Sequence, residues 1–217
     1  MLKSYLPDEN MYKTDLAKFA IIGTGGHASS VLDILESHEI VPEFLVSDSD
    51  TENEKWGIPV IPERQIRSYS STHNFVLGIG ALKFRSAWLS HDYMEVLRMP
   101  TVCHRTSYVS SRTSFGTGST IHSFAHIGPG VKIGNFCIIN SGVTIDHDVV
   151  IGNNVVISPG ATIAGGSNLG DGSFVGMGAL ITENTSVGEF SVIGANSFVN
   201  GHVPAASRVF GTPGRLK

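Results

Sequence analysis

A six-residue repeat runs from Val109 to Pro204 and limits the possible fold more than any other feature of the chain. These 96 residues divide into 16 rows without an insertion; Ile, Val or Leu stands first in fifteen rows, and the fifth place is always small or β-branched. Side chains alternate across an extended strand, so the first and fifth places can both point inward. The period therefore predicts a solenoid of the β-helix type, with the aliphatic column as its core.

Turns are expected between the short strands of this repeat. Gly, Asn and Asp gather there, and these residues adopt a positive φ at little cost. One rung cannot bury its own apolar face, so successive rungs must stack on one another.

Composition restricts the class of protein further. The 217 residues carry a formal net charge of −4 and no basic run, which argues against a nucleic-acid partner. The two cysteines, Cys103 and Cys137, form no disulfide framework, and Cys137 stands at an inward place where a small core residue is expected. No apolar run reaches membrane-spanning length, and the N-terminus lacks a signal-peptide pattern. We therefore expect a soluble, cytoplasmic protein.

Alternating strands and helices are predicted before the repeats, which indicates a small parallel α/β domain. The expected strands are residues 19–22, 44–46, 58–60 and 74–79, and the expected helices are residues 27–36 and 83–97. The predicted organisation is an N-terminal arm (1–18), an α/β domain (19–100), a β-helix domain (101–204) and a C-terminal tail (205–217).

A glycine-rich turn follows the first expected strand. Gly23, Gly25 and Ala28 fit the pattern G-x-G-x-x-G/A, and Asp48 stands about where an acidic residue would contact a ribose hydroxyl. Glycines let phosphate oxygens approach the backbone, and a helix N-terminus favours anions. About 80 residues are too few for two mononucleotide-binding halves, so a nucleotide diphosphate is favoured over a nicotinamide dinucleotide. A tight turn without a ligand remains an alternative.

The order of these parts, with Gly25-Gly26-His27 early and the segment from Asn140 to Asp148 within the repeats, resembles the NeuD/PglD-type sugar acetyltransferases. The group includes N-acetyltransferases for perosamine and for 4-amino-4,6-dideoxyglucose. The resemblance implies a Rossmann-like domain followed by a left-handed parallel β-helix, in which three rows make one triangular coil. It further implies acetyl-CoA as co-substrate, no metal, a nucleotide-sugar substrate, a homotrimer with sites between subunits, and a role in glycan biosynthesis such as that of lipopolysaccharide O-antigen.

The same resemblance assigns roles in acetyl transfer. His147 corresponds to the general base, Asp148 to the carboxylate that holds it, and Asn140 to a supporting residue. Imidazole has a pKa suited to taking a proton from an attacking amine near neutral pH. Gly165 follows His147 by three rows, which is one coil, so it is expected directly above His147 with its backbone N–H directed at the acetyl carbonyl. A surface histidine without a catalytic role is the alternative.

Binding residues follow from the resemblance in the same way. Acetyl-CoA is assigned to Gly165, Gly166, Arg215 and Lys217, and a frayed basic tail is the alternative for the last two. The nucleotide sugar is assigned to Gly23, Gly25, Gly26, His27, Ser47, Asp48 and Gly80. Two positions depart from the family pattern: Val156, expected to face outward, replaces a second histidine, and Ser47 replaces the first of two adjacent acids.

Three other functions remain open from the sequence. An acetyltransferase of this kind could modify a hydroxyl of a sialic-acid-type sugar instead of an amine. A zinc enzyme like γ-carbonic anhydrase would need three histidines, for which His122, His126 and His147 are the candidates. A non-catalytic solenoid would bind no acetyl-CoA. The sequence alone does not distinguish the nucleotide, the sugar, or N- from O-acetylation.

Overall fold

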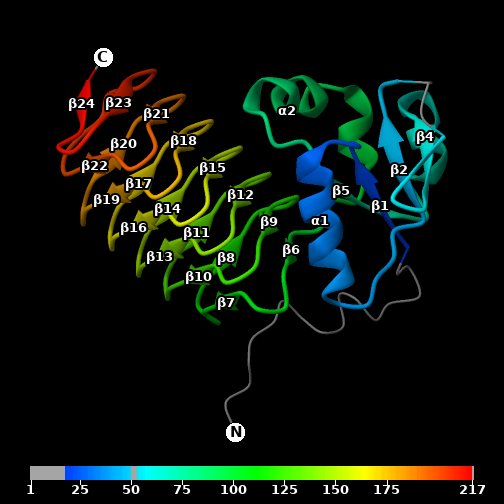
Figure 1. Cartoon of the computed structure of the whole chain (residues 1–217), viewed down its shortest axis with the longest axis horizontal. Helices are drawn as coiled ribbons and strands as arrows, with labels where there is room; N and C mark the ends of the chain where they lie inside the picture. The colour runs from blue at the N-terminus through cyan, green and yellow to red at the C-terminus, as the bar shows by residue number, and fades with distance from the viewer. Residues whose placement is uncertain (1–17, 50–52, 217) are drawn as a thin grey trace, which may run out of the picture. The chain divides into compact units, whose positions relative to one another are not determined.

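The computed structural model describes residues 18–49 and 53–216, which excludes most of the expected N-terminal arm. The chain divides into an α/β unit that ends at Arg105 and a solenoid unit that begins at Thr106 (Figure 1). This boundary lies beyond the one expected after residue 100. The reason is local: the backbone N–H of Arg105 donates to Ser37 Oγ, and His38 Nε2 bonds the Cys103 carbonyl, so this segment is tied to the α/β unit. None of the helices in the described ranges is long and apolar enough to cross a membrane.

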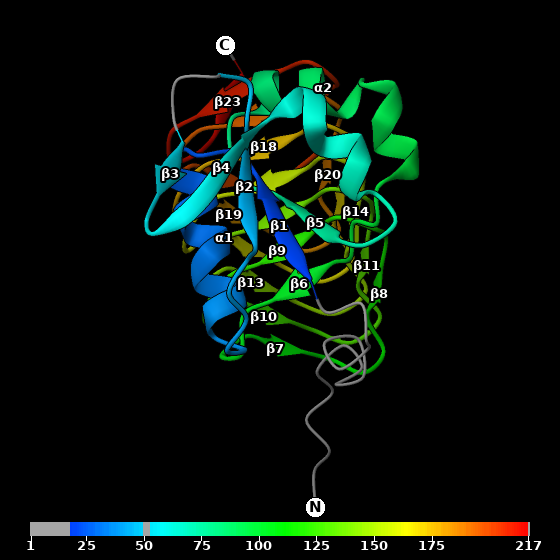
Figure 2. The same cartoon turned by 90° about the vertical axis from the view of Figure 1, so that its right-hand side faces the viewer.

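The α/β unit contains a five-stranded sheet in the order β3-β4-β2-β1-β5, with β1 between β2 and β5 (Figure 2). All neighbouring strands run parallel except β3, which is antiparallel to β4. The elements are β1 (Phe19–Ile22), α1 (Gly26–Glu36), β2 (Phe44–Ser47), β3 (Glu54–Lys55), β4 (Ile58–Pro62), the 3₁₀ helix η2 (Glu63–Tyr69), β5 (Asn74–Leu77), α2 (Leu82–Leu89), the 3₁₀ helix η3 (Asp92–Val96) and β6 (Val102–Cys103).

The core of this unit follows the predicted apolar pattern. Every residue of β1 and β2 is buried, as expected for central strands of a parallel sheet. Helix α1 places Val31, Leu32 and Leu35 in the same cluster as Ile21 and Leu45. These contacts fix the start of α1 relative to the end of β1, where the glycine turn lies.

The second expected helix is interrupted. Helix α2 ends at Leu89, and His91 is extended (φ −70°, ψ 139°) before η3 begins at Asp92. Two side-chain contacts tie η3 to η2: the Tyr93 hydroxyl donates to Glu63 Oε1 over 2.7 Å, and Arg67 pairs with Asp92. Because these contacts are tertiary, the local helical pattern of residues 83–97 did not predict the break. The 3₁₀ helix η2 was not predicted from the sequence either.

The solenoid unit is built from short strands, all of two residues except β23, and they form three sheets that are parallel except at β24. Their orders are β22-β19-β16-β13-β10-β7, β20-β17-β14-β11-β8 and, from the C-terminus, β24-β23-β21-β18-β15-β12-β9. Strand partners are three rows apart in the sequence, as in His126 with Thr144 and Lys132 with Val150, so the predicted coil of three rows is confirmed. The strands are β7 (Tyr108–Val109), β8 (Ser114–Phe115), β9 (Thr120–Ile121), β10 (His126–Ile127), β11 (Lys132–Ile133), β12 (Ile138–Ile139), β13 (Thr144–Ile145), β14 (Val150–Ile151), β15 (Val156–Ile157), β16 (Thr162–Ile163), β17 (Asn168–Leu169), β18 (Phe174–Val175), β19 (Leu180–Ile181), β20 (Ser186–Val187), β21 (Val192–Ile193), β22 (Phe198–Val199), β23 (Arg208–Phe210) and β24 (Arg215–Leu216).

Burial and backbone angles explain the repeat. The first and fifth places of the rows are buried through the middle of the solenoid, as at Ile145 and Val149. The fourth place adopts a positive φ in fourteen of the sixteen rows, where it holds glycine seven times, Asn or Asp four times and Phe three times. Glycine and asparagine tolerate this conformation best, which is why they mark the corners of the triangle.

Side-chain hydrogen bonds stack one corner of the triangle. The backbone N–H of Thr117 donates to Asn135 Oδ1 over 2.9 Å, that of Asn135 to Asn153 Oδ1 over 2.9 Å, and that of Asn153 to Asp171 Oδ1 over 2.7 Å. Each residue of this polar ladder (Thr117, Asn135, Asn153 and Asp171) stands one full coil from the next. The ladder satisfies backbone donors that the corners would otherwise leave to water.

The last coil differs from the others. Val192 pairs with Arg208, which falls short of a full coil, and β24 then runs antiparallel to β23. The Gly214 N–H donates to the Phe198 carbonyl over 2.7 Å, which fixes the turn between the two strands. The alternative of a frayed tail is therefore wrong for residues 205–216, because these residues form an ordered end of the sheet.

Candidate active site

His147 and Asp148 form an exposed hydrogen-bonded pair at the corner that follows β13. The Nδ1 atom of His147 lies 2.9 Å from Asp148 Oδ2, and the two side chains are 57% and 73% exposed. Asp146 Oδ1 accepts the backbone N–H of His147 over 2.8 Å. With Nδ1–H donating to Asp148, the neutral ring carries a free lone pair on Nε2, as a general base requires.

The two carboxylates raise the pKa of His147. The hydrogen bond that the His147 ring donates to Asp148 is the largest cause, and the charge of Asp146 adds to it, because both favour the imidazolium form. Desolvation of the ring opposes these two effects but does not cancel them, so the pKa of His147 remains raised. The imidazole is therefore more basic than an isolated histidine side chain, which favours the acceptance of a proton.

Gly165 lies one coil further on, against the His147 ring. A Cβ atom on Gly165 would stand 2.7 Å from both Cε1 and Nε2 of His147. Any residue other than glycine at this position would therefore displace the His147 ring. The Gly166 N–H donates to the His147 carbonyl over 3.0 Å, which holds the two coils in register. The predicted alignment of His147 with Gly165 across one coil is thus what the structure contains.

The backbone N–H of Gly165 has no hydrogen-bond acceptor among residues 18–49 and 53–216. The contrast with the polar ladder is informative, because there a side chain of the following coil accepts the N–H at the same place in the row. At Gly165 the corresponding donor stays open beside the lone pair of His147 Nε2. A donor and a base next to each other are the two groups that an acyl-transfer site needs.

Asn140 lies at the other end of β13, at the preceding corner of the coil. Its Nδ2 atom donates to the Ile157 carbonyl over 2.9 Å, in the following coil. The structure therefore does not bring Asn140 to His147 within one chain. Val156, which replaces the family's second histidine, is 5% exposed and stands between the inward residues Val155 and Ile157, so its outward place in the row is covered.

The three histidines of the zinc alternative do not gather. His122 is buried, whereas the exposed His126 ring stacks on Tyr108 with 4.8 Å between ring centroids. His147 is engaged by Asp148. Within the described ranges, no group of three or more His, Cys, Asp or Glu side chains could hold a metal ion.

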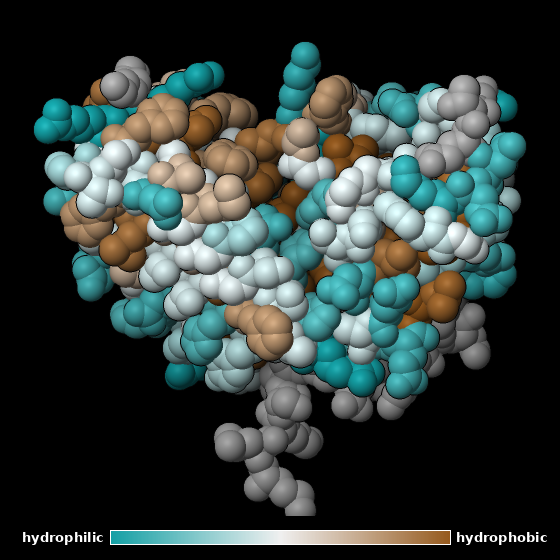
Figure 3. Space-filling model, viewed as in Figure 1, coloured by the Kyte–Doolittle hydropathy of each residue, from teal (hydrophilic) through white to brown (hydrophobic). Residues whose placement is uncertain are grey.

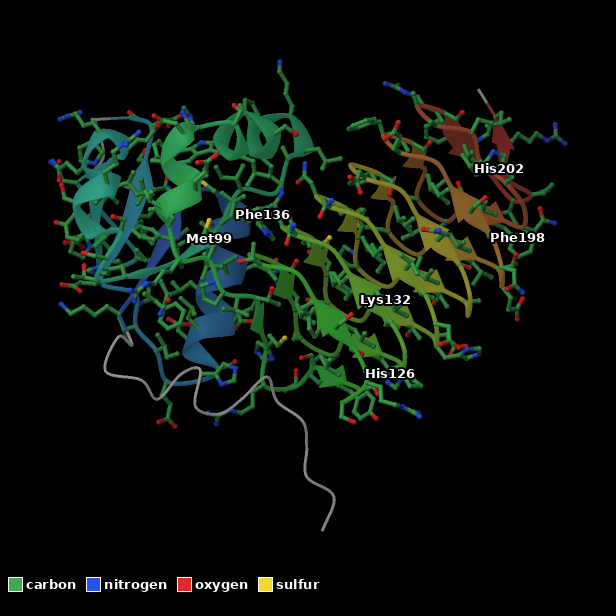
Figure 4. The ribbon with its side chains drawn as sticks, turned by 180° about the vertical axis from the view of Figure 1, so that it is seen from behind. Met99, His126, Lys132, Phe136, Phe198 and His202 are labelled. Atoms are coloured by element: carbon green, nitrogen blue, oxygen red, sulfur yellow. The ribbon has the colours of Figure 1, made fainter. Side chains whose placement is uncertain are left out.

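A small cavity of about 230 Å³ lies further along the corner that carries His147. Gly201 and His202 line it, and Gly201 stands three coils beyond His147 in the row register. Figure 4 shows His202 at the C-terminal end of the solenoid and His126 at the opposite end. Leu216 also lines the cavity, next to Arg215 in β24, whereas Lys217 lies outside the described residues.

A larger cleft of about 510 Å³ lies within the α/β unit. All of the predicted substrate-binding residues line it: Gly23, Gly25, Gly26, His27, Ser47, Asp48 and Gly80. The cleft opens where β2 and β5 leave opposite sides of β1, the switch point at which open α/β sheets bind ligands. Its volume falls in the range typical of ligand pockets.

The start of α1 makes one side of this cleft suitable for an anion. Gly25 is the N-cap and makes no side-chain capping bond, and a Cβ atom on Gly25 or Gly26 would meet nothing within 4 Å. The first N–H groups of a helix lack intrahelical partners and attract anions. Gly23 has a φ of +116°, and its approach to the Gly78 carbonyl leaves no room for a side chain. The turn therefore presents bare backbone to the cleft.

Sequence reasoning missed part of the cleft lining. Gly78 stands at the end of β5, where a Cβ atom would lie 2.7 Å from Ile21 and 2.8 Å from Ala28. Phe84 and Trp88 line the cleft from α2, and Phe84 is 62% exposed. The available signal was the Gly78-Ile79-Gly80 run, which overlaps the end of the strand predicted over residues 74–79, because a second glycine turn marks the other side of the same crevice.

Two family models match the chain. One is the PglD N-terminal domain, over residues 18–91, and the other is the bacterial transferase hexapeptide model, over residues 112–147. Comparison with curated protein sequences gives no significant match.

Solved structures resemble the chain over nearly its whole length. The acetyltransferase domain of PglB from Neisseria gonorrhoeae, in complex with acetyl coenzyme A, is 26% identical with a TM-score of 0.86, covering 92% of this chain and 98% of that one. PerB from Caulobacter crescentus, in complex with CoA and GDP-perosamine, is 25% identical with a TM-score of 0.85, covering 92% and 97%. WeeI from Acinetobacter baumannii shares the fold at 20% identity, with a TM-score of 0.81 over 92% and 99%. The predicted fold, a Rossmann-like unit followed by a left-handed parallel β-helix, is confirmed.

Proposed function

The chain belongs to the NeuD/PglD-type sugar acetyltransferases, and on this premise we propose that it transfers an acetyl group from acetyl-CoA to the 4-amino group of a nucleotide-linked 4-amino-4,6-dideoxysugar. The observation that carries the proposal is the His147–Asp148 pair beside the open N–H of Gly165. The relatives add support, since PerB was solved with CoA and GDP-perosamine and the PglB domain with acetyl coenzyme A.

The proposed chemistry begins with the acceptor amine. His147 Nε2 takes a proton from the amine as its nitrogen attacks the thioester carbonyl, and the new C–N bond forms. The Gly165 N–H donates to the oxygen that becomes negatively charged in the tetrahedral intermediate. When the C–S bond breaks, the imidazolium of His147 returns the proton to the leaving thiolate. Asp148 keeps the ring in the required tautomer and stabilises its cation throughout.

The corner of the solenoid offers a path for the co-substrate. Successive strands of a sheet lie about 4.8 Å apart, so three coils separate His147 from the Gly201–His202 cavity by roughly 14 Å. We assign the thioester end of acetyl-CoA to Gly165 and Gly166. The distal phosphates are assigned to the far end, where Arg215 supplies a cation and Lys217 follows in the sequence.

The nucleotide sugar is assigned to the cleft of the α/β unit. The diphosphate would accept hydrogen bonds from the uncapped start of α1, at Gly25, Gly26 and His27. Asp48 would accept from a ribose hydroxyl or a base N–H, and Ser47 lies beside it. Some family members have two adjacent acids at this place, whereas this chain has Ser47 and Asp48. Recognition of the nucleotide base should therefore be measured directly, with UDP-, dTDP- and GDP-linked substrates.

The remaining family features are proposed with the same activity. Apolar side chains reach the surface of the solenoid unit, and the exposed ones include Tyr108, Phe124, Val150, Met177, Leu180 and Phe190. Figure 3 shows apolar (brown) areas on the visible face of this unit, in its left half. Homotrimerisation would cover part of this surface. We further propose a metal-independent enzyme that acts in the cytoplasm in glycan biosynthesis, such as that of lipopolysaccharide O-antigen. Sedimentation as a monomer at working concentration would contradict the trimer.

Thiol release from acetyl-CoA tests the activity directly. The acceptors are UDP-, dTDP- and GDP-linked 4-amino-4,6-dideoxyhexoses and free sialic acid, each with and without EDTA. We expect release with one amino-sugar nucleotide and a product heavier by one acetyl group on nitrogen. Thiol release with sialic acid alone would move the assignment to O-acetylation. No thiol release with any acceptor, together with no binding of acetyl-CoA, would refute the proposed acetyltransferase activity.

Two variants locate the chemistry. His147→Gln should lower kcat by about 100-fold or more, the range typical for loss of a general base. The exposed His126, which lies in β10 of the preceding coil and pairs with Thr144, provides the control, and His126→Gln should leave kcat unchanged. Equal activity of His147→Gln and the parent enzyme would remove His147 from the mechanism.

A further inference from the structure

The carboxylate of Asp148 lies against Gly130, one coil earlier. A Cβ atom on Gly130 would overlap with Asp148 Oδ1 and would lie 3.4 Å from its Cγ. The same carboxylate uses its other oxygen, Oδ2, to accept from His147. The carboxylate that accepts the hydrogen bond from His147 therefore packs directly against the Cα atom of a glycine.

This packing follows from the geometry of the corner. Asp148 has a φ of +57° and Gly130 a φ of +75°, and both occupy the fourth place of their rows. The Asp148 N–H donates to the Pro129 carbonyl over 3.0 Å, and this bond fixes the spacing between the corner at Asp148 and the corner at Gly130 in the preceding coil. A side chain at this place folds back over the preceding coil, as Asn184 does over Gly166 and Asn196 over Gly178. Glycine at position 130 is the residue that leaves room for this arrangement.

We propose that Gly130 is a positioning residue for acetyl transfer, which acts through Asp148 on the tautomer and basicity of His147. This inference rests on the proposed function for its catalytic meaning. A methyl group at position 130 would push the carboxylate away from the Nδ1 atom of His147. The proton on Nδ1 would then lose its acceptor, and the ring would no longer be held with the Nε2 lone pair facing Gly165.

Two charged groups act on the His147 ring among the described residues, Asp146 and Asp148. Asp146 accepts the backbone N–H of His147, and this contact does not involve the Asp148 carboxylate that packs against Gly130. A change at Gly130 should therefore remove the influence of Asp148 and leave that of Asp146. The expected result is a partial fall in the pKa of His147, since the remaining carboxylate still favours the cation.

The test is Gly130→Ala, with Gly160→Ala as a matched control. Gly160 also occupies the fourth place of its row, with a φ of +69°, but a Cβ atom there would meet nothing within 4 Å. Both variants carry the same kind of backbone strain, and only one of them disturbs a side chain. Circular dichroism and thermal unfolding of the full chain show whether each variant is folded.

The readout is an NMR titration of the His147 ring, assigned by the signal that disappears in His147→Gln. We expect Gly130→Ala to shift this titration to lower pH and Gly160→Ala to leave it in place. In the transfer assay, Gly130→Ala should lower kcat by about 10- to 100-fold, as small misplacements of catalytic groups do, with KM for both substrates unchanged. Because the titration needs no turnover, it can succeed or fail independently of the proposed function.

A double variant separates positioning from general damage. If Gly130 acts only through Asp148, then Gly130→Ala should cause no further shift of the His147 titration in an Asp148→Asn background. A folded Gly130→Ala protein with the parental titration would overturn the inference. An equal shift in Gly160→Ala would overturn it as well, because backbone strain alone would then account for the effect.

Discussion

The imidazole of His147 lies directly against Gly165, the residue that follows it by one full coil, at a distance that excludes any Cβ atom. The coil repeat thus places two groups from distant rows next to each other without a loop between them. The base comes from one coil and the open N–H from the next. Their spacing is set by the hydrogen-bonded stack of strands on either side, β13 with β16 and β14 with β17.

Replacement of Gly165 tests this juxtaposition. In Gly165→Ala the new methyl group would stand 2.7 Å from His147 Nε2, so the ring must move away from the donor. We expect kcat to fall by about 100-fold, similar to the loss of one oxyanion donor. The KM for the nucleotide sugar should not change. Gly160→Ala is the control, since it strains the backbone without touching a side chain; a comparable loss of kcat there would contradict the explanation.

The pH dependence of the rate tests the role of Asp148. The pKa of His147 is raised by Asp148 and Asp146, and a general base must be unprotonated, so activity should fall as the pH drops through that raised pKa. In Asp148→Asn the pKa of His147 should decrease, and the acidic limb of the kcat/KM profile should move to lower pH. The plateau should also drop, by about 10- to 1,000-fold, because the tautomer is no longer fixed. An acidic limb that stays in place would exclude Asp148 as the cause of the shift.

The anion site at the start of α1 is tested by a charge at its N-cap. Gly25→Asp has room for its side chain, and aspartate favours an N-cap, so the protein should be as stable as the parent or slightly more stable. The added charge should nevertheless repel a diphosphate and raise the KM for the nucleotide sugar by about tenfold or more. The KM for acetyl-CoA should stay the same. Gly25→Asn supplies the cap without the charge, and an equal rise in KM for this variant would point to steric block instead.

The polar ladder should contribute to stability and not to catalysis. Asn153→Ala removes the acceptor for the Asn135 N–H and the donor to Asp171, so we expect the free energy of unfolding to fall by about 1–3 kcal/mol. Asn168→Ala is the control, because the side chain of Asn168 is exposed and makes no hydrogen bond within the described residues. Urea unfolding of both variants gives the comparison. Equal stabilities would show that water replaces the ladder without loss.

The solenoid could be predicted from the sequence almost residue by residue. Its rules are local and repeated: an inward aliphatic at Ile145, an inward small residue at Val149, and a corner residue such as Asp148 between them. Arithmetic on the period then places Gly165 against His147. The same arithmetic fails in the last coil, where Val192 pairs with Arg208 before a full coil is complete, because the regular rows end there.

The α/β unit was predicted less completely, for a physical reason. Strands β1, β2 and β5 follow from apolar runs, but the end of α2 at Leu89 depends on contacts with η2, a segment distant in sequence. The cleft shows the same division. The glycine turn at Gly23 carries a local signal, whereas Phe84 and Trp88 line the cleft only because α2 packs across its opening.

A six-residue repeat does not by itself limit the number of coils, because each coil can stack on the next in the same way. Each parallel strand exposes N–H and C=O groups that could accept another strand, and an uncapped stack could grow by adding another molecule end to end. In this chain the last parallel strand of one sheet, β23, pairs with β24, which runs in the opposite direction and carries the exposed Arg215. A reversed, charged strand is a poor template for the next parallel rung, so this hairpin limits the solenoid to a fixed length and protects that sheet from polymerisation.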